Sequence, residues 1–185
     1  MNEKERTHIS KFLSLVLRHQ PESIGLTLDE GGWAYVNDLL QKIKYKNVLI
    51  DHAMLKEVVA TNNKKRFAFN EDETKIRASQ GHSIEVELGY NPSIPPAILY
   101  HGTAEKNLPF IREQGLLKQN RQHVHLSADK ETALKVGRRH GKPIVLEVMA
   151  ATMCDEGYAF FISANQVWLT NHVPADYIHF DNPQM

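Results

Sequence analysis

Arginine and histidine side chains occur at three places where the chain changes direction. Arg18 and His19 lie at the end of the first predicted helix, and Arg66 begins a predicted strand. Arg138 and Arg139 lie between a predicted helix and a predicted strand. Arginine binds phosphate through a planar fork of donors with a permanent charge. A site with three arginines and one histidine would therefore suit a reaction that binds and transfers a phosphate dianion.

Each of these cations also has an ordinary structural explanation. At the C-terminus of a helix, Arg18 and His19 would complement the helix dipole, which is worth roughly 0.3–1 kcal/mol. Arg66 could be a solvated arginine of a β-hairpin, and one of Arg138 and Arg139 is expected to be solvated as well. Nothing in the spacing alone requires the three places to meet.

A second group of candidate residues is rich in histidine. His101 is followed by Gly102 and Thr103 at the end of one predicted strand, and His125 and Ser127 follow one another in a second such region. A histidine followed by glycine can place an imidazole beside a ligand while the backbone approaches closely. Two histidines on one strand face could bind zinc, but the chain has a single cysteine and no H-E-x-x-H motif. We therefore expect no metal site.

The N-terminal half should fold as helices followed by a β-hairpin. Apolar residues at helical spacing predict a first helix that starts near Glu3. Asn37 and Asp51 are expected to cap two further helices. Residues 66–69 and 75–78 alternate in polarity about a turn, which predicts a hairpin whose two phenylalanines face the core. This order of elements is typical of a small winged-helix unit, and many such units bind DNA.

The chain should divide into two lobes, because three prolines among residues 91–96 form a stiff, extended connector. We predict a winged-helix-like lobe over residues 1–90, a linker over 91–96 and a β-rich lobe over 97–185. Short strands are predicted in the second lobe at 97–100, 123–126, 143–148, 159–162, 166–169 and 177–180, with helices at 106–113 and 129–136. Strands with few helices between them predict the α+β class. The sequence has neither a glycine-rich dinucleotide fingerprint nor a Walker loop.

Charge and composition argue against several kinds of protein. Lys plus Arg and Asp plus Glu both number 22, and neither side of Tyr90 has the basic excess of a general polyanion binder. Any nucleic acid should therefore be bound through a few placed cations. Without a long apolar run, a secretory signal or a second cysteine, the sequence predicts a cytoplasmic protein that does not enter a membrane. We expect it to be a monomer.

A series of short sequence blocks runs through nearly the whole chain in a fixed order. The blocks are SKFLS, LRHQP, GW, DLL, KRF, IRASQGHS, LYHGT, HLS, VGRRHG and VWLT. Each block is short, but their number and order together are specific. With these blocks the sequence resembles the NAD-dependent RNA 2′-phosphotransferase family.

The resemblance implies a winged-helix lobe followed by an ADP-ribosyltransferase-like lobe that holds NAD. It implies a transferase of tRNA splicing, which removes the 2′-phosphate left at the splice junction of tRNA. In the first step, the RNA 2′-phosphate attacks the anomeric carbon of the nicotinamide ribose and expels nicotinamide. In the second step, the ribose 2″-hydroxyl attacks phosphorus and releases RNA with a free 2′-hydroxyl, together with ADP-ribose 1″,2″-cyclic phosphate. NAD is consumed as a cosubstrate.

The resemblance also assigns roles to individual residues. The catalytic residues that it implies are Arg18, His19, Arg66 and Arg139. The NAD-binding residues that it implies are His101, Gly102, Thr103, His125 and Ser127. Arg139, rather than Arg138, matches the Arg-His-Gly of the family. Gln80 and His82 match family positions too, but no role follows for them from the sequence.

Two other functions stay open at this point. Many protein ADP-ribosyltransferases hold the 2″-hydroxyl with a glutamate on a late strand, and residues 165–169 contain no carboxylate, which argues against ordinary protein ADP-ribosylation. An ADP-ribosyltransferase that acts on phosphorylated nucleic-acid ends would carry out the first step only. A winged-helix regulator would bind duplex DNA and would turn over no NAD.

Overall fold

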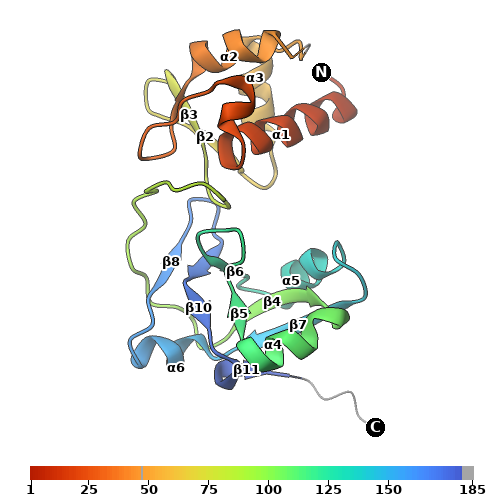
Figure 1. Cartoon of the computed structure of the whole chain (residues 1–185), viewed down its shortest axis with the longest axis vertical. Coiled ribbons are helices and arrows are strands. Elements are labelled where there is room, and N and C mark those ends of the chain that lie inside the picture. Colours follow the sequence, from red (N-terminus) through yellow and green to blue (C-terminus); the bar gives the residue numbers. More distant parts are fainter. Residues whose placement is uncertain (47, 181–185) are drawn as a thin grey trace. The chain divides into compact units, whose positions relative to one another are not determined.

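The computed structural model describes residues 1–46 and 48–180. The chain divides into two compact units, Met1–Gly89 and Tyr90–Met185 (Figure 1). Both units contain helices and small antiparallel sheets, so the predicted α+β class is confirmed. None of the described helices is long and apolar enough to cross a membrane.

The first unit begins with the amphipathic helix α1 (Glu3–Arg18), as the sequence predicts. A capping box starts this helix. The Asn2 side chain accepts a hydrogen bond from the Glu5 N–H, and the Glu5 carboxylate accepts one from the Asn2 N–H, each 2.9 Å long. Arg18 is the last helical residue and His19 is the C-cap, because proline two residues later prevents another turn. Both candidate residues are therefore fixed at the end of a helix whose apolar face is buried.

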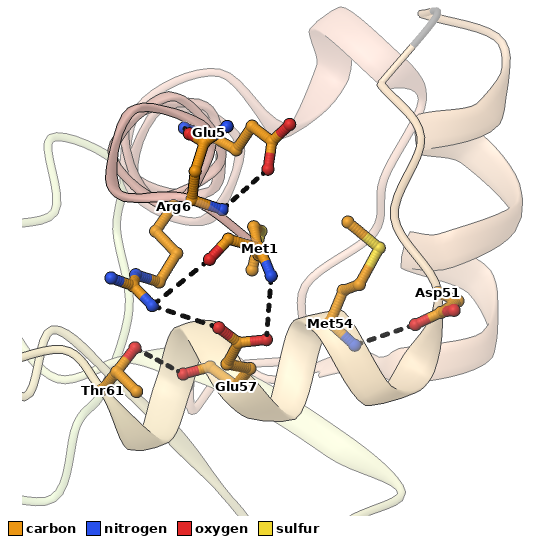
Figure 2. Close-up of polar contacts among 8 residues, drawn as sticks. Met1, Glu5, Arg6, Asp51, Met54, Glu57 and Thr61 are labelled. Carbon is orange, nitrogen blue, oxygen red and sulfur yellow. Dashed lines mark hydrogen bonds and ion pairs between the residues drawn. The ribbon is translucent and has the colours of Figure 1, made fainter.

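Figure 2 shows two kinds of polar contact made by helix α3 (His52–Ala60): a side-chain cap at its N-terminus and a contact with α1. Asp51 caps α3 as predicted, since its carboxylate accepts the Met54 N–H at 2.8 Å. In the middle of α3, the Glu57 carboxylate accepts a hydrogen bond of 3.2 Å from Arg6 of α1. This pair links the two helices across the surface of the unit.

Helix α2 (Val36–Lys44) begins two residues earlier than a cap at Asn37 would allow. The prediction that Asn37 caps this helix is wrong, because the chain enters α2 directly from the strand β1 (Ala34–Tyr35). The Val36 N–H donates to the Thr74 carbonyl at 2.9 Å. A hydrogen bond to a distant segment thus replaces the local side-chain cap.

Strand β1 belongs to a three-stranded antiparallel sheet with the order β1-β3-β2. The predicted hairpin is confirmed as β2 (Phe67–Phe69) and β3 (Lys75–Ala78), with Phe67 opposite Ala78. Phe67 is buried and Phe69 packs against the same core, as the alternation predicts. The fully buried core residues include Leu13, Leu17, Leu39, Ile43, Leu55 and Ile76.

The second unit contains two three-stranded sheets and one strand pair. The first sheet, in the order β11-β7-β4, consists of β4 (Leu99–Ala104), β7 (Pro143–Val148) and β11 (Ile178–His179). The second sheet, in the order β6-β9-β8, consists of β6 (Val124–Leu126), β8 (Phe160–Ile162) and β9 (Trp168–Thr170). The strand pair is β5 (Leu116–Leu117) with β10 (His172–Val173). The two sheets are joined where Tyr100 and Ser127 exchange main-chain hydrogen bonds of 2.9 and 2.8 Å.

Short helices connect these strands. They are α4 (Leu108–Gln114), α5 (Lys130–Gly137) and α6 (Ala150–Asp155), with the 3-10 helices η2 (Glu105–Asn107) and η3 (Ala175–Tyr177); η1 (Pro21–Ile24) lies in the first unit. Each predicted strand and helix of this half corresponds to an observed element, with ends shifted by up to four residues. Helix α6 escapes prediction because it is six residues long and has no side-chain cap.

Helix α5 lies very close to strand β4 because both elements have glycine at the contact. A Cβ atom on Gly102 would lie 1.7 Å from the Ala133 carbonyl oxygen. A Cβ atom on Gly137 would lie 2.7 Å from the Thr103 carbonyl oxygen. The sequence suggests Gly102 as a place where the backbone approaches a ligand. In the structure, its missing side chain lets the backbone of α5 approach β4.

We expect Gly102→Ala to lower the free energy of unfolding by more than about 3 kcal/mol, because the added methyl group would overlap main-chain atoms of α5. Denaturant unfolding measures this change. Gly157→Ala is the matched control: no atom lies within 4 Å of its Cβ position, and its φ of +97° should cost only about 1–2 kcal/mol. Equal losses in the two variants would contradict the packing argument.

Candidate functional site

Three of the predicted site residues come together at the end of α1 in the first unit. Nη2 of Arg18 donates a hydrogen bond of 3.4 Å to the carbonyl oxygen of Arg66. The Arg18 guanidinium carbon also lies 5.9 Å from the centre of the Phe67 ring, where a cation is attracted by the ring face. His19 follows Arg18 directly as the helix cap. Arg18, His19 and the main chain of Arg66 are therefore neighbours, although 48 residues separate the two arginines.

Arg66 is held by the turn that precedes β2. Its guanidinium donates to the Asn62 side-chain oxygen at 3.4 Å. Lys65 has a positive φ of 42°, which a non-glycine residue seldom adopts, and its N–H donates to the Asn62 carbonyl at 2.8 Å. A tight turn, in which Asn62 accepts hydrogen bonds from Lys65 and Arg66, thus fixes the position of Arg66.

Residues 79–83, which follow β3, hold these cations in place, and we call them the bracket segment. At one end, the Ser79 N–H donates to the Arg66 carbonyl at 2.8 Å, and the Ser79 hydroxyl donates to the Lys65 carbonyl at 2.8 Å. At the other end, the Ser83 N–H donates to the Arg18 carbonyl at 3.0 Å. The Ser83 hydroxyl lies 2.9 Å from Nδ1 of His19. The bracket segment therefore joins the turn of Arg66 to the end of α1.

His82 lies at the centre of the bracket segment and is only 1% exposed. Burial, followed by the charges of Arg18, His19 and Arg77, lowers the pKa of this imidazole from 6.5 to about 4. Within the described part of the chain, neither ring nitrogen of His82 has a hydrogen-bond partner, and the same holds for the side-chain oxygen of Gln80. A neutral imidazole thus lies among the cations of this unit.

Sequence reasoning missed the role of the bracket segment. Its block, IRASQGHS, contributed to the family resemblance, but no local pattern indicates that its two serines reach Lys65 and Arg18. Polar residues in a chain of mixed charge are common on any surface loop. Only the long-range hydrogen bonds distinguish this one.

The second unit brings together His101 and His125 from the NAD-binding prediction. Nδ1 of His101 donates to the His125 carbonyl oxygen at 3.0 Å, because a carbonyl can only accept. Burial lowers the pKa of His101; the carbonyl bond opposes this effect, and the charges of Arg121 and His140 add to it. The neutral ring of His101 therefore has its hydrogen on Nδ1, and Nε2 is left as an acceptor.

His125 has the opposite arrangement of its ring hydrogen. Its Nδ1 lies 3.1 Å from Nη1 of Arg121. An arginine can only donate, so Nδ1 of His125 is the acceptor and Nε2 carries the hydrogen. Two neighbouring histidines thus offer one acceptor and one donor atom.

Of the other predicted residues of this unit, Thr103 lies on β4, Ser127 pairs with β4 and Arg139 lies in the turn after α5. The buried Thr103 hydroxyl accepts a hydrogen bond of 3.1 Å from Asn107. Ser127 joins the two sheets through its main chain. Arg139 is exposed in the turn after α5, where its N–H donates to the Val136 carbonyl at 3.2 Å. The adjacent His140 is close enough to His101 for its charge to lower the pKa of that residue.

The described residues contain no group of three or more His, Cys, Asp or Glu side chains that could hold a metal ion. Permanent positive charge comes instead from arginine in both units. Arginine and neutral histidine offer hydrogen-bond donors and acceptors suited to phosphate and hydroxyl groups.

Comparisons with known proteins give one consistent result. The model of the RNA 2′-phosphotransferase, Tpt1/KptA family, matches residues 4–172. A protein of Flavobacterium johnsoniae named probable RNA 2′-phosphotransferase is 57% identical over 180 residues, which cover 97% of this chain and 99% of that protein. A protein with the same name from Fusobacterium nucleatum is 54% identical over 173 residues, which cover 93% of this chain and 97% of that protein. Another from Trichormus variabilis is 51% identical over 182 residues, or 98% of this chain and 100% of its own.

The low pKa of His82 predicts how stability depends on pH. Between pH 6.5 and about 4 the unfolded chain binds a proton at this residue and the folded chain does not, so the free energy of unfolding falls as the pH falls through this range. The full effect is about 3 kcal/mol. We expect His82→Leu to lose this part of the pH dependence in urea unfolding measured from pH 7 to pH 4, whereas His8→Gln, at an exposed position of α1, should keep it. Parallel pH curves for the wild type and His82→Leu would contradict the assignment.

Proposed function

The chain belongs to the RNA 2′-phosphotransferase family, Tpt1/KptA, and from this premise we propose that it removes an internal 2′-phosphate from RNA by transferring the phosphate to NAD. The observation that carries the proposal is that the Arg18 side chain, His19 and the main chain of Arg66 meet at one end of α1, where the bracket segment binds them. Arginines that are already assembled can bind a phosphate dianion without further reorganisation.

The proposed reaction has two steps. In the first, an oxygen of the RNA 2′-phosphate forms a bond to the anomeric carbon of the nicotinamide ribose, while the bond to nicotinamide breaks and nicotinamide leaves. In the second, the ribose 2″-oxygen bonds to phosphorus and gives up its proton. The bond from phosphorus to the RNA 2′-oxygen breaks, and that oxygen takes a proton. The products are RNA with a 2′-hydroxyl and ADP-ribose 1″,2″-cyclic phosphate.

In this proposal the first unit recognises the phosphate. The guanidinium groups of Arg18 and Arg66 donate to its oxygens and neutralise the charge that they carry, in both steps. His19 donates a hydrogen bond or a proton from Nε2, since its Nδ1 is engaged by Ser83. We further propose that this unit is a winged-helix lobe, which is supported by its three helices and its sheet order β1-β3-β2.

The second unit, in turn, would hold NAD. Nε2 of His101 is an acceptor and suits a ribose hydroxyl, while Nε2 of His125 is a donor and suits a phosphate or hydroxyl oxygen. We propose that Thr103 and Ser127 contribute to the same binding site. The main chain of Gly102, which α5 keeps in place, would supply the main-chain groups of β4 that contact NAD. We propose that this unit is an ADP-ribosyltransferase-like lobe.

We also propose Arg139, of the second unit, as a catalytic residue. Its exposed position leaves the guanidinium able to contact a substrate phosphate. Because arginine supplies the charge in both units, we propose that the reaction requires no metal ion.

The central test is an assay with a short RNA that carries one internal 2′-phosphate, incubated with and without NAD and with and without a metal chelator. We expect loss of the phosphate only when NAD is present, with release of nicotinamide and of ADP-ribose 1″,2″-cyclic phosphate, and with no effect of the chelator. Release of nicotinamide while the RNA keeps its phosphate would instead indicate an ADP-ribosyltransferase of phosphorylated ends. Salt-sensitive duplex binding without NAD turnover would indicate a regulator.

Substitutions at the arginines test the proposed roles. Replacing Arg18, Arg66 or Arg139 singly by alanine should lower kcat for phosphate removal by roughly 100- to 1,000-fold, the usual loss when a donor to a transition-state oxyanion is removed. Arg138→Ala is the matched control, because it removes an arginine from the same exposed turn and should change kcat less than about twofold. Equal losses for Arg138→Ala and Arg139→Ala would contradict the assignment of Arg139.

A further inference from the structure

The Ser83 hydroxyl, which engages Nδ1 of His19, has no role of its own in the reaction scheme above. The Ser83 hydroxyl lies 2.9 Å from Nδ1 of His19. We propose that Ser83 is a positioning residue, which holds the His19 ring so that Nε2 is the atom presented to the phosphate in every protonation state of the ring. This inference rests on the proposed function for its catalytic meaning, while the geometry of the ring can be tested without any turnover.

The chemistry of a hydroxyl group makes it a suitable partner for a ring that changes its protonation. When His19 is neutral with its hydrogen on Nε2, the Ser83 hydroxyl can donate to Nδ1. When the ring is charged, Nδ1–H can donate to the same oxygen, and this continues after Nε2 has given up its proton. One contact therefore keeps the ring in place before, during and after proton transfer.

The contrast with His101 shows why the kind of partner matters. Nδ1 of His101 is bound to a carbonyl oxygen, which can only accept, so the neutral ring must leave Nε2 as an acceptor. Such a histidine cannot donate from Nε2 unless it is charged. With Ser83 as its partner, His19 can donate to a phosphate oxygen while it is still neutral.

The position of the Ser83 hydroxyl is itself fixed by the fold. The Ser83 N–H donates to the carbonyl of Arg18, the residue before His19, at 3.0 Å. The far end of the bracket segment is bound to the turn of Arg66 through Ser79. His82, the neighbour of Ser83, is buried at 1% exposure, which restricts the movement of the segment at this point. The hydroxyl thus belongs to the same rigid part of the unit as the helix end that it serves.

Charged and titratable groups around His19 come from each neighbouring element. Arg18 lies on α1, Arg77 on β3 and His82 on the bracket segment; the charges of Arg18, His19 and Arg77 all lower the pKa of His82. The two arginines cannot replace the Ser83 hydroxyl as an acceptor when Nδ1 is protonated, because arginine has only donors. Ser83 therefore has a function that the surrounding cations do not supply.

The experiment combines ring spectroscopy with kinetics on the full chain. Long-range proton–nitrogen spectra of histidine-labelled protein report the position of the ring hydrogen, and His19→Gln identifies the His19 signals. In Ser83→Ala we expect these signals to move towards those of the exposed His8, and kcat for phosphate removal to fall about 10-fold or more, as expected for a misplaced catalytic group. The KM for NAD should not change.

Two further variants separate positioning from general damage. Ser83→Thr keeps the hydroxyl and should restore both the wild-type ring signals and kcat. Ser14→Ala is the matched control, since the Ser14 hydroxyl binds the main chain of the same helix at 2.8 Å, and it should change neither. Because Ser83 is exposed, Ser83→Ala should fold normally.

The outcomes distinguish this inference from the proposed function. Unchanged His19 signals and unchanged kcat in Ser83→Ala would overturn the positioning role while phosphate removal by the wild type still stands. Failure of Ser83→Thr to restore the signals would also overturn it. If the wild type shows no NAD-dependent phosphate removal but the ring signals respond to Ser83→Ala and Ser83→Thr as expected, the proposed function fails and the positioning of His19 holds.

Discussion

Like charges repel, and the first unit must nevertheless hold several of them at one end of α1. The Arg18 guanidinium lies beside the main chain of Arg66 there, and the charges of Arg18, His19 and Arg77 all act on His82. The structure meets this constraint with main-chain dipoles: the Arg66 carbonyl accepts hydrogen bonds from both Arg18 and Ser79, and the Arg18 carbonyl accepts one from Ser83. Carbonyl oxygens offset part of the repulsion between the cations without neutralising them. A carboxylate in the same place would form ion pairs and compete with any phosphate ligand.

The same concentration of charge explains the unusual state of His82. Burial would add a desolvation penalty to a charged ring at this position, and the neighbouring cations would repel it, so the ring stays neutral well below the usual pKa of histidine. Its burial also gives the bracket segment a fixed centre, from which one serine reaches the turn of Arg66 and the other reaches the end of α1. The apolar core, the cations and the bracket segment therefore depend on one another, although each comes from a different part of the chain.

Local patterns in the sequence predict most helices and strands of this fold, but they do not predict contacts between residues far apart in the chain. Helix α1 and the β2–β3 hairpin follow from periodicity and proline, because both are determined within a few residues. The start of α2 is set by the distant Thr74 carbonyl, so the local preference of Asn37 for a cap position is overridden. In the same way, the sequence predicts that Arg18, His19 and Arg66 could do chemistry, but the bracket segment that assembles them is visible only in hydrogen bonds between residues far apart in the chain.

Which atom a histidine offers to a ligand is another property that no sequence pattern contains. His101 and His125 are neighbours of the same type, yet one is paired with a carbonyl and the other with an arginine, and their ring hydrogens lie on different nitrogens as a result. His19 has a third kind of partner, a hydroxyl, which allows either state. A ribose hydroxyl can use a fixed acceptor, because it does not change its charge during binding. A phosphate that forms one ester bond and loses another needs a donor that stays in place while its own proton count changes, and a hydroxyl partner is the simplest group that permits this.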